Sequence, residues 1–111
     1  MELAIRAEGA ATVVRPVAER LDAMVAVQFK DRMKAALEGG GALVVLDLSP
    51  IGFLDSSGLG ALVALRRFLR DGQRLELAAL TPAVMRVFRL TRMDRVFPLH
   101  PHLPHEARNA V

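Results

Sequence analysis

The sequence contains no cysteine, tryptophan or tyrosine, and only five phenylalanines among its 111 residues. Without cysteine the chain has neither a disulfide nor a thiolate metal ligand, which fits a reducing cytoplasm. The scarcity of aromatic side chains argues against a platform for stacking nucleic-acid bases. We therefore expect a cytoplasmic protein that binds neither nucleic acid nor a metal ion.

Long apolar runs are also missing. No stretch approaches the roughly 18 apolar residues of a membrane span, and Glu2 and Arg6 make the first ten residues unlike a signal peptide. We therefore expect no membrane association. The chain is 52% hydrophobic and 24% charged, as in a globular domain. Its net charge is +3, with basic residues alternating with acidic ones along the chain.

The spacing of apolar residues predicts strands alternating with helices. We expect strands at residues 3–8, 11–19, 42–48, 74–80 and 95–99, and helices at 23–37, 57–70, from 81 onward and from His105. Asp22 is expected to cap the first helix, and Pro16 suits a sheet edge or strand end. Such alternation is typical of an α/β fold, with a mixed β-sheet whose parallel pairs are covered by helices. Residues 1–100 then form one domain, and residues 101–111 form a tail containing Pro and His.

The segment DLSPIGFLDSSGLGAL, residues 47–62, joins a predicted buried strand to a predicted helix. Asp55 or Ser56 can cap the first helical turn, and Gly58 permits close approach of another surface. One capping side chain is enough for the first helical turn, so Ser57 is not needed for capping. The segment is therefore either a capping cluster alone or a functional serine site, where a helix N-terminus tolerates an added phosphate.

A serine-dependent enzyme is a weaker alternative. A nucleophilic serine needs a nearby base, and the three histidines, His100, His102 and His105, all fall near the C-terminus. The G-x-S-x-G and phosphate-loop patterns are both absent. The irregular HPHLPH segment is expected to be a solvated tail rather than a metal site.

The second predicted helix has two distinct sides. A helical wheel places Leu62, Leu65, Phe68 and Leu69 on one side, which we expect to be core. The opposite side carries Arg66, Arg67 and Arg70, with Val63 among them. This second side is either a solvated basic face or the continuation of a partner surface that begins at the serines.

The segment VVLDLSPIGFLDSSGLGALVAL resembles the signature of the STAS domain, in the form found in bacterial anti-sigma factor antagonists. The matching residues are Asp47-Leu48-Ser49 at the strand end and Asp55-Ser56-Ser57-Gly58-Leu59 at the helix start. Leu21-Asp22 before the first helix is compatible with the family. The resemblance extends over roughly residues 3–100 and implies a single STAS-like domain.

The resemblance implies a binding module and not an enzyme, with no cofactor. Its expected partner is an anti-sigma factor, a serine kinase of the histidine-kinase-like ATPase class, whose sequestration frees a sigma factor. The kinase would phosphorylate Ser57, the serine before the glycine, with Ser56 as the secondary candidate, and a serine phosphatase would reverse this. The expected partner-binding residues are Asp22, Asp55, Ser56, Ser57, Gly58, Leu59, Val63, Arg66 and Arg67.

The sequence is also compatible with a different partner and with self-association. The chain could instead be a small STAS subunit of a lipid-transport ATPase complex, where it would grip the ATPase without phosphorylation. A weak homodimer is also compatible with the sequence.

Overall fold

A computed structural model describes residues 1–104, and the helix expected from His105 lies outside them. The strands are β1 (Glu2–Glu8), β2 (Ala11–Val17), β3 (Arg20–Leu21), β4 (Leu43–Asp47), β5 (Phe53–Leu54), β6 (Arg74–Ala78) and β7 (Leu99–His100). The α-helices are α1 (Ala26–Gly39), α2 (Ser56–Ala64) and α3 (Pro82–Leu90), and two 3-10 helices are η1 (Leu65–Phe68) and η2 (Met93–Arg95).

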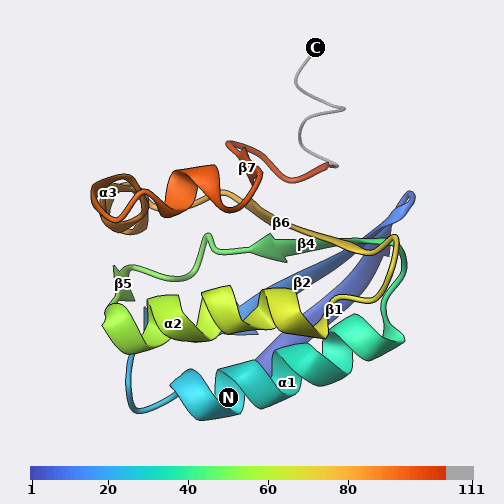
Figure 1. Cartoon of the computed structure of the whole chain (residues 1–111), viewed down its shortest axis with the longest axis horizontal. Helices are drawn as coiled ribbons and strands as arrows, with labels where there is room; N and C mark the ends of the chain where they lie inside the picture. Colours follow the sequence, from blue (N-terminus) through green and yellow to red (C-terminus); the bar gives the residue numbers. More distant parts are fainter. Residues whose placement is uncertain (105–111) are drawn as a thin grey trace.

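The main sheet has the strand order β1-β2-β4-β6-β7 (Figure 1). Strands β1 and β2 pair antiparallel, and the remaining neighbours pair parallel. A second, small sheet joins β3 to β5 in parallel. The predicted α/β fold with a mixed sheet is confirmed. Pro16 lies beyond Val14, where the pairing of β2 with β4 ends, so it costs that ladder no hydrogen bond.

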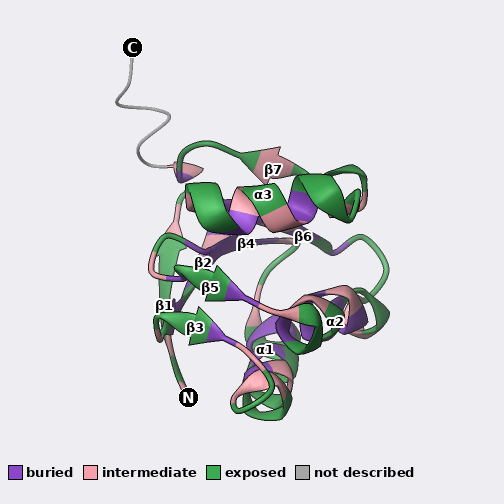
Figure 2. Ribbon diagram, turned by 90° about the vertical axis from the view of Figure 1, so that its left-hand side faces the viewer, coloured by how far each residue is buried: buried purple, intermediate pink, exposed green. Residues whose placement is uncertain are grey.

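Strand β4 is covered on both faces, as its nearly continuous apolar sequence predicts. Val44 and Leu46 belong to the large core shared with α1, α2 and α3. Val45 belongs to a smaller cluster on the opposite face, together with Val13 and Leu103. Figure 2 shows buried residues along β4 and β6. Leu103, from the segment predicted as a tail, therefore packs onto the sheet.

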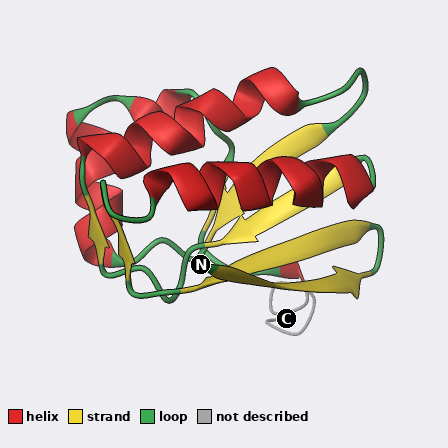
Figure 3. Ribbon diagram, turned by 90° about the horizontal axis from the view of Figure 1, so that it is seen from below, coloured by secondary structure: helices red, strands yellow, loops and turns green. Residues whose placement is uncertain are grey.

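Helices α1 and α2 lie side by side over one face of the sheet (Figures 1 and 3). The buried residues of α1 are Phe29, Met33, Ala36 and Leu37, which fall on one face at helical spacing. Helix α3 lies at the end of the sheet where β4 and β6 end (Figure 1). Thr81 caps this helix by accepting a hydrogen bond from the Val84 N–H at 3.5 Å.

Helix α1 begins three residues later than predicted, at Ala26, and Asp22 is not its N-cap. The carbonyl of Asp22 accepts hydrogen bonds from the N–H groups of Val25 and Ala26, which closes a turn before the helix. Its carboxylate accepts the Met24 N–H at 3.0 Å. Asp22 therefore stabilises the turn that leads into α1 and not the first helical turn itself.

The second helix is shorter than the predicted span to residue 70. It continues as η1 to Phe68, and Leu69 is already extended. Arg70 is exposed, as predicted, but it lies beyond the end of this helix. Its guanidinium donates hydrogen bonds to the carbonyls of Leu37 at 2.9 Å and Gly40 at 2.6 Å. These carbonyls end α1 and lack helical partners, so Arg70 has a structural role.

The strand predicted at residues 95–99 is also corrected. Met93–Arg95 form η2, and β7 is limited to Leu99–His100. The apolar residues of the predicted strand serve packing instead, because Phe97 is buried in the large core.

A matched pair of substitutions tests the placement of the core. Leu65 is fully buried, whereas Leu90 is 78% exposed. Leu65→Ala leaves a cavity and should lower the free energy of unfolding by about 2–5 kcal/mol. Leu90→Ala should change it by less than about 0.5 kcal/mol. Urea unfolding of both variants checks this, and equal effects would contradict the core assignment.

Candidate functional site: the serines at the start of α2

The candidate site lies in the connection between β4 and α2. Asp47 ends β4 as a buried residue, and its carboxylate accepts the Ser49 N–H at 2.9 Å. Farther along, the Ile51 carbonyl accepts a hydrogen bond from the Thr81 hydroxyl at 2.8 Å. These contacts fix the loop against the start of α3. These hydrogen bonds therefore fix the position of the connection that precedes α2.

Asp55 is the N-cap of α2, as one of the two predicted capping alternatives. One carboxylate oxygen accepts the Gly58 N–H at 2.9 Å. The other accepts the Ala23 N–H at 3.2 Å, from the segment before α1. A single carboxylate thus holds together the starts of two helices that are far apart in the sequence.

Gly58 is buried against the backbone of β3. A Cβ atom at this position would lie 2.0 Å from the carbonyl oxygen of Leu21. No side chain fits at that distance, so the glycine is required by packing. Gly58 was predicted to contact a partner, but the structure buries it. Its close contact with β3 determines how near the start of α2, with the two serines, lies to that strand.

The two serines are exposed and line different grooves. Ser57 lines a groove of about 400 Å³ between α1 and α2, which also includes Ala23, Lys30 and Arg67. Ser56 lines a groove of about 550 Å³ between α2 and η2, which includes Met93. A partner that occupies only one groove therefore distinguishes one serine from the other.

The remaining predicted residues fall into two groups. Leu59 and Val63 are half-buried: both pack against the core, and both also line the groove beside Ser56. Val63 is therefore only partly on the solvent face where it was predicted. Arg66 and Arg67 are exposed, and neither has an ion pair within residues 1–104. Arg67 lines both grooves.

Asp22, which was also predicted to contact a partner, forms an ion pair with the Arg20 Nε at 3.1 Å. This ion pair stabilises the turn before α1.

Sequence reasoning missed the residues that other elements contribute to these grooves. Lys30 comes from α1 and Met93 from η2. Neither stands near the serines in the sequence, and no local motif marks them. Their positions follow from the packing of α1 and η2 beside α2.

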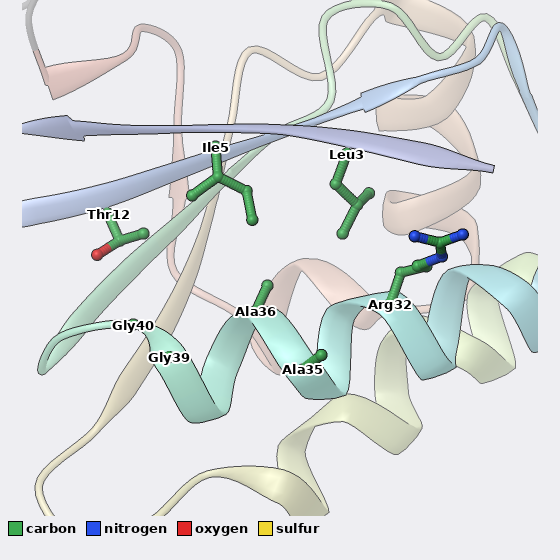
Figure 4. A pocket seen from close by; sticks show the side chains of 8 residues that line it. All are labelled: Leu3, Ile5, Thr12, Arg32, Ala35, Ala36, Gly39 and Gly40. Carbon is green, nitrogen blue, oxygen red and sulfur yellow. The ribbon is translucent and has the colours of Figure 1, made fainter.

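A third groove, of about 320 Å³, lies between β1 and α1, with Leu3 and Ile5 pointing toward the helix and Arg32 at one end (Figure 4). Neither serine lines it. It is therefore separate from the candidate site.

His100, one of the two histidines within residues 1–104, contacts a carboxylate. The Nε2 atom of His100 lies 2.8 Å from a carboxylate oxygen of Glu76, on the neighbouring strand. Among residues 1–104, no group of three or more His, Asp or Glu side chains is arranged to hold a metal ion.

Comparison with known proteins places this geometry in a family. The family model described as "Mlab, STAS domain" matches residues 3–101. The chain belongs to the STAS domain family. Within residues 1–104, no helix combines the length and the apolar character needed to cross a membrane.

Several individual relatives share the fold. The chain is 29% identical over 84 residues to an anti-sigma-B factor antagonist of Listeria monocytogenes, covering 75% of this chain and 74% of the relative. The crystal structure of an anti-sigma factor antagonist from Mycobacterium paratuberculosis superposes with a TM-score of 0.82 at 29% identity, covering 99% and 92% of the two chains. An anti-sigma factor antagonist (STAS) domain protein from Planctomyces limnophilus gives a TM-score of 0.82 at 25% identity, covering 97% and 96%.

Two glycines of α2 provide a matched test of the site's packing. Gly58→Ala should lower the free energy of unfolding by about 1–3 kcal/mol or more, because the new methyl group meets the Leu21 backbone. Gly60→Ala meets no atom within 4 Å and should raise stability by about 0.5–1 kcal/mol. Thermal unfolding of both variants checks the difference. A stable Gly58→Ala variant would show that β3 does not lie against α2.

Proposed function

We propose that this protein is an anti-sigma factor antagonist, a binding module switched by phosphorylation of Ser57. Its partner is an anti-sigma factor that is also a serine kinase of the histidine-kinase-like ATPase class. Binding sequesters this partner and frees a sigma factor, and a serine phosphatase restores the phosphorylated module to activity. The observation that carries the proposal is the exposed serine pair on a rigidly fixed helix start.

The local contacts support this assignment. Asp55 caps α2 and Gly58 sits against β3, so the serine backbone is held without using either serine hydroxyl as the cap. Ser56 and Ser57 are both exposed, so a partner and a kinase can reach their hydroxyl groups. The relatives named above are antagonists of anti-sigma factors, which favours the same role here.

A phosphate at Ser57 would act at the binding surface and not on the fold. It adds about −1.5 to −2 charges and three acceptor oxygens, and the positive end of the α2 dipole tolerates them. Asp55 already has hydrogen-bond partners for both carboxylate oxygens, so the cap stays in place. A partner docked over the groove, however, would meet a bulky anion, and a loss of about 3 kcal/mol lowers affinity roughly a hundredfold.

Ser57 is expected to be the phosphoacceptor. Incubation of the wild-type protein with the partner kinase and ATP, followed by peptide mapping, should locate phosphate on Ser57. Ser56→Ala should be phosphorylated like the wild type, whereas Ser57→Ala should not. Because the serines line different grooves, phosphate mainly on Ser56 would place the kinase on the side of η2 and contradict the proposal.

The switch itself is tested by Ser57→Asp and Ser57→Ala. Both variants should fold, since neither side chain is buried and a carboxylate is acceptable at this helix start. Calorimetry with the purified anti-sigma factor should show binding weakened at least tenfold for Ser57→Asp and unchanged for Ser57→Ala. Equal affinities of the two variants would exclude an electrostatic and steric switch.

Co-purification from the native host separates this function from the remaining alternatives. Recovery of a serine-kinase anti-sigma factor supports the proposal. Recovery of a transporter ATPase, with no phosphate on either serine, would support a subunit of a lipid-transport complex instead. Hydrolysis of an ester or phosphoester by the purified protein would support a serine-dependent enzyme.

A further inference from the structure

Helix α3 and η2 together form a positively charged segment of the chain. Residues 82–95 contain Arg86, Arg89, Arg92 and Arg95 and a single acid, Asp94. The resulting net charge of +3 equals that of the whole chain. The alternation of acids and bases that we describe for the sequence as a whole therefore does not extend to α3 and η2.

We call these four arginines the arginine face. All four are exposed, and within residues 1–104 none of them has an ion pair with a carboxylate. A cation near a helix C-terminus interacts favourably with the helix dipole, which accounts for Arg89 in the last turn of α3. The other three arginines need a different explanation.

Arg92 occupies a backbone conformation that suits glycine. It directly follows the C-cap of α3 with φ 61° and ψ 21°, a left-handed conformation that costs an L-residue about 1–2 kcal/mol. Glycine is the usual residue at this position. An exposed arginine without an internal partner therefore stands where glycine would make the fold more stable. This departure from the local rule points to a function for its charge.

An apolar groove lies beside the arginine face. It has a volume of about 530 Å³ and is lined by Leu80, Pro82, Met85, Arg86, Arg89 and Leu90. Leu90 is 78% exposed, although α3 buries Val84 and Phe88 on its inner side. The groove therefore offers apolar contacts with guanidinium groups at its rim.

This combination favours one kind of ligand. Nucleic acid is disfavoured, because the two phenylalanines of this region, Phe88 and Phe97, are buried and unavailable for stacking. An anionic membrane is disfavoured, because the apolar stripe of α3 is turned into the core and a concave groove does not fit a flat surface. Guanidinium groups bind carboxylates in paired, charge-assisted hydrogen bonds. An extended peptide with acidic and apolar side chains satisfies both the rim and the groove.

We propose that the arginine face and its groove form a docking site for an acidic, apolar peptide segment of another protein. The site is distinct from the two serines, and it adjoins them through Met93, which lines the groove beside Ser56. The inference does not depend on phosphorylation of Ser57 or on the identity of the anti-sigma factor.

A random dodecapeptide library displayed on phage tests the proposal with the full chain as bait. Selected peptides should combine Asp or Glu with Leu, Phe or Met. In NMR titrations, the best synthetic peptide should perturb the amides of α3 and η2. Selection without enrichment of acidic residues, or a footprint elsewhere on the protein, would overturn the proposal.

Three variants then measure the contributions of charge and groove. Arg92→Gly should weaken peptide binding about fivefold and leave the melting temperature equal or higher, because glycine fits the backbone. Leu90→Ala should also weaken binding, without a loss of stability. Arg15→Gln removes an exposed arginine from β2 and should leave binding within about twofold. Unchanged affinity in Arg92→Gly, or equal losses in Arg92→Gly and Arg15→Gln, would overturn the proposal.

Two further probes separate the peptide from other anions. Vesicles of phosphatidylglycerol and phosphatidylcholine, and a deoxythymidine oligonucleotide, are offered to the wild type and to Arg92→Gly. The proposal expects neither probe to compete with the selected peptide at equal charge concentration. Stronger binding of vesicles or oligonucleotide than of any selected peptide, lost in Arg92→Gly, would assign the arginine face to a membrane or to nucleic acid and overturn the proposal.

Discussion

The junction of α2 with the segment before α1 is the contact on which the candidate site depends. The Asp55 carboxylate accepts one N–H from each of the two segments, and Gly58 allows the α2 backbone to lie against Leu21. A side chain at Gly58, or the loss of Asp55, would move the helix away from β3. Neither serine hydroxyl is needed as the cap of α2, because the Asp55 carboxylate supplies it.

Helices α2 and α3 begin at the same end of the main sheet. The connections after β4 and β6 lead into α2 and α3, so both helices start at the carboxyl ends of parallel strands, where α/β proteins commonly bind ligands. The loop before α2 is held to the start of α3 by the Thr81 hydroxyl. Met93 of η2, which follows Arg92 in the sequence, lines the groove beside Ser56. A partner that binds in the groove beside Ser56 meets Arg66 and Arg67 of η1, which line it.

Much of the scaffold could be predicted from local patterns. The run from Leu43 to Asp47 is apolar at every position except the last, and such a strand must be covered on both faces. Thr81-Pro82 signals a helix start by side-chain capping and fixed proline geometry, and the structure agrees. Asp55 and the two serines also carry a local signal, because capping needs residues adjacent in sequence. Helix ends were less predictable: α2 changes to a 3-10 helix at Leu65 with no glycine or proline to mark it.

The sequence by itself determined the α/β class and a capped helix start at Asp55 or Ser56, because these features depend on hydrogen bonds and apolar periodicity among near neighbours. Only the tertiary structure decided that Arg70 binds the end of α1, and that Val63 packs against the core while it lines the groove beside Ser56. It also decided that Ser56 and Ser57 line different grooves. Each of these depends on an element more than 25 residues away, and the angle at which that element packs is set by the whole core and not by any local motif.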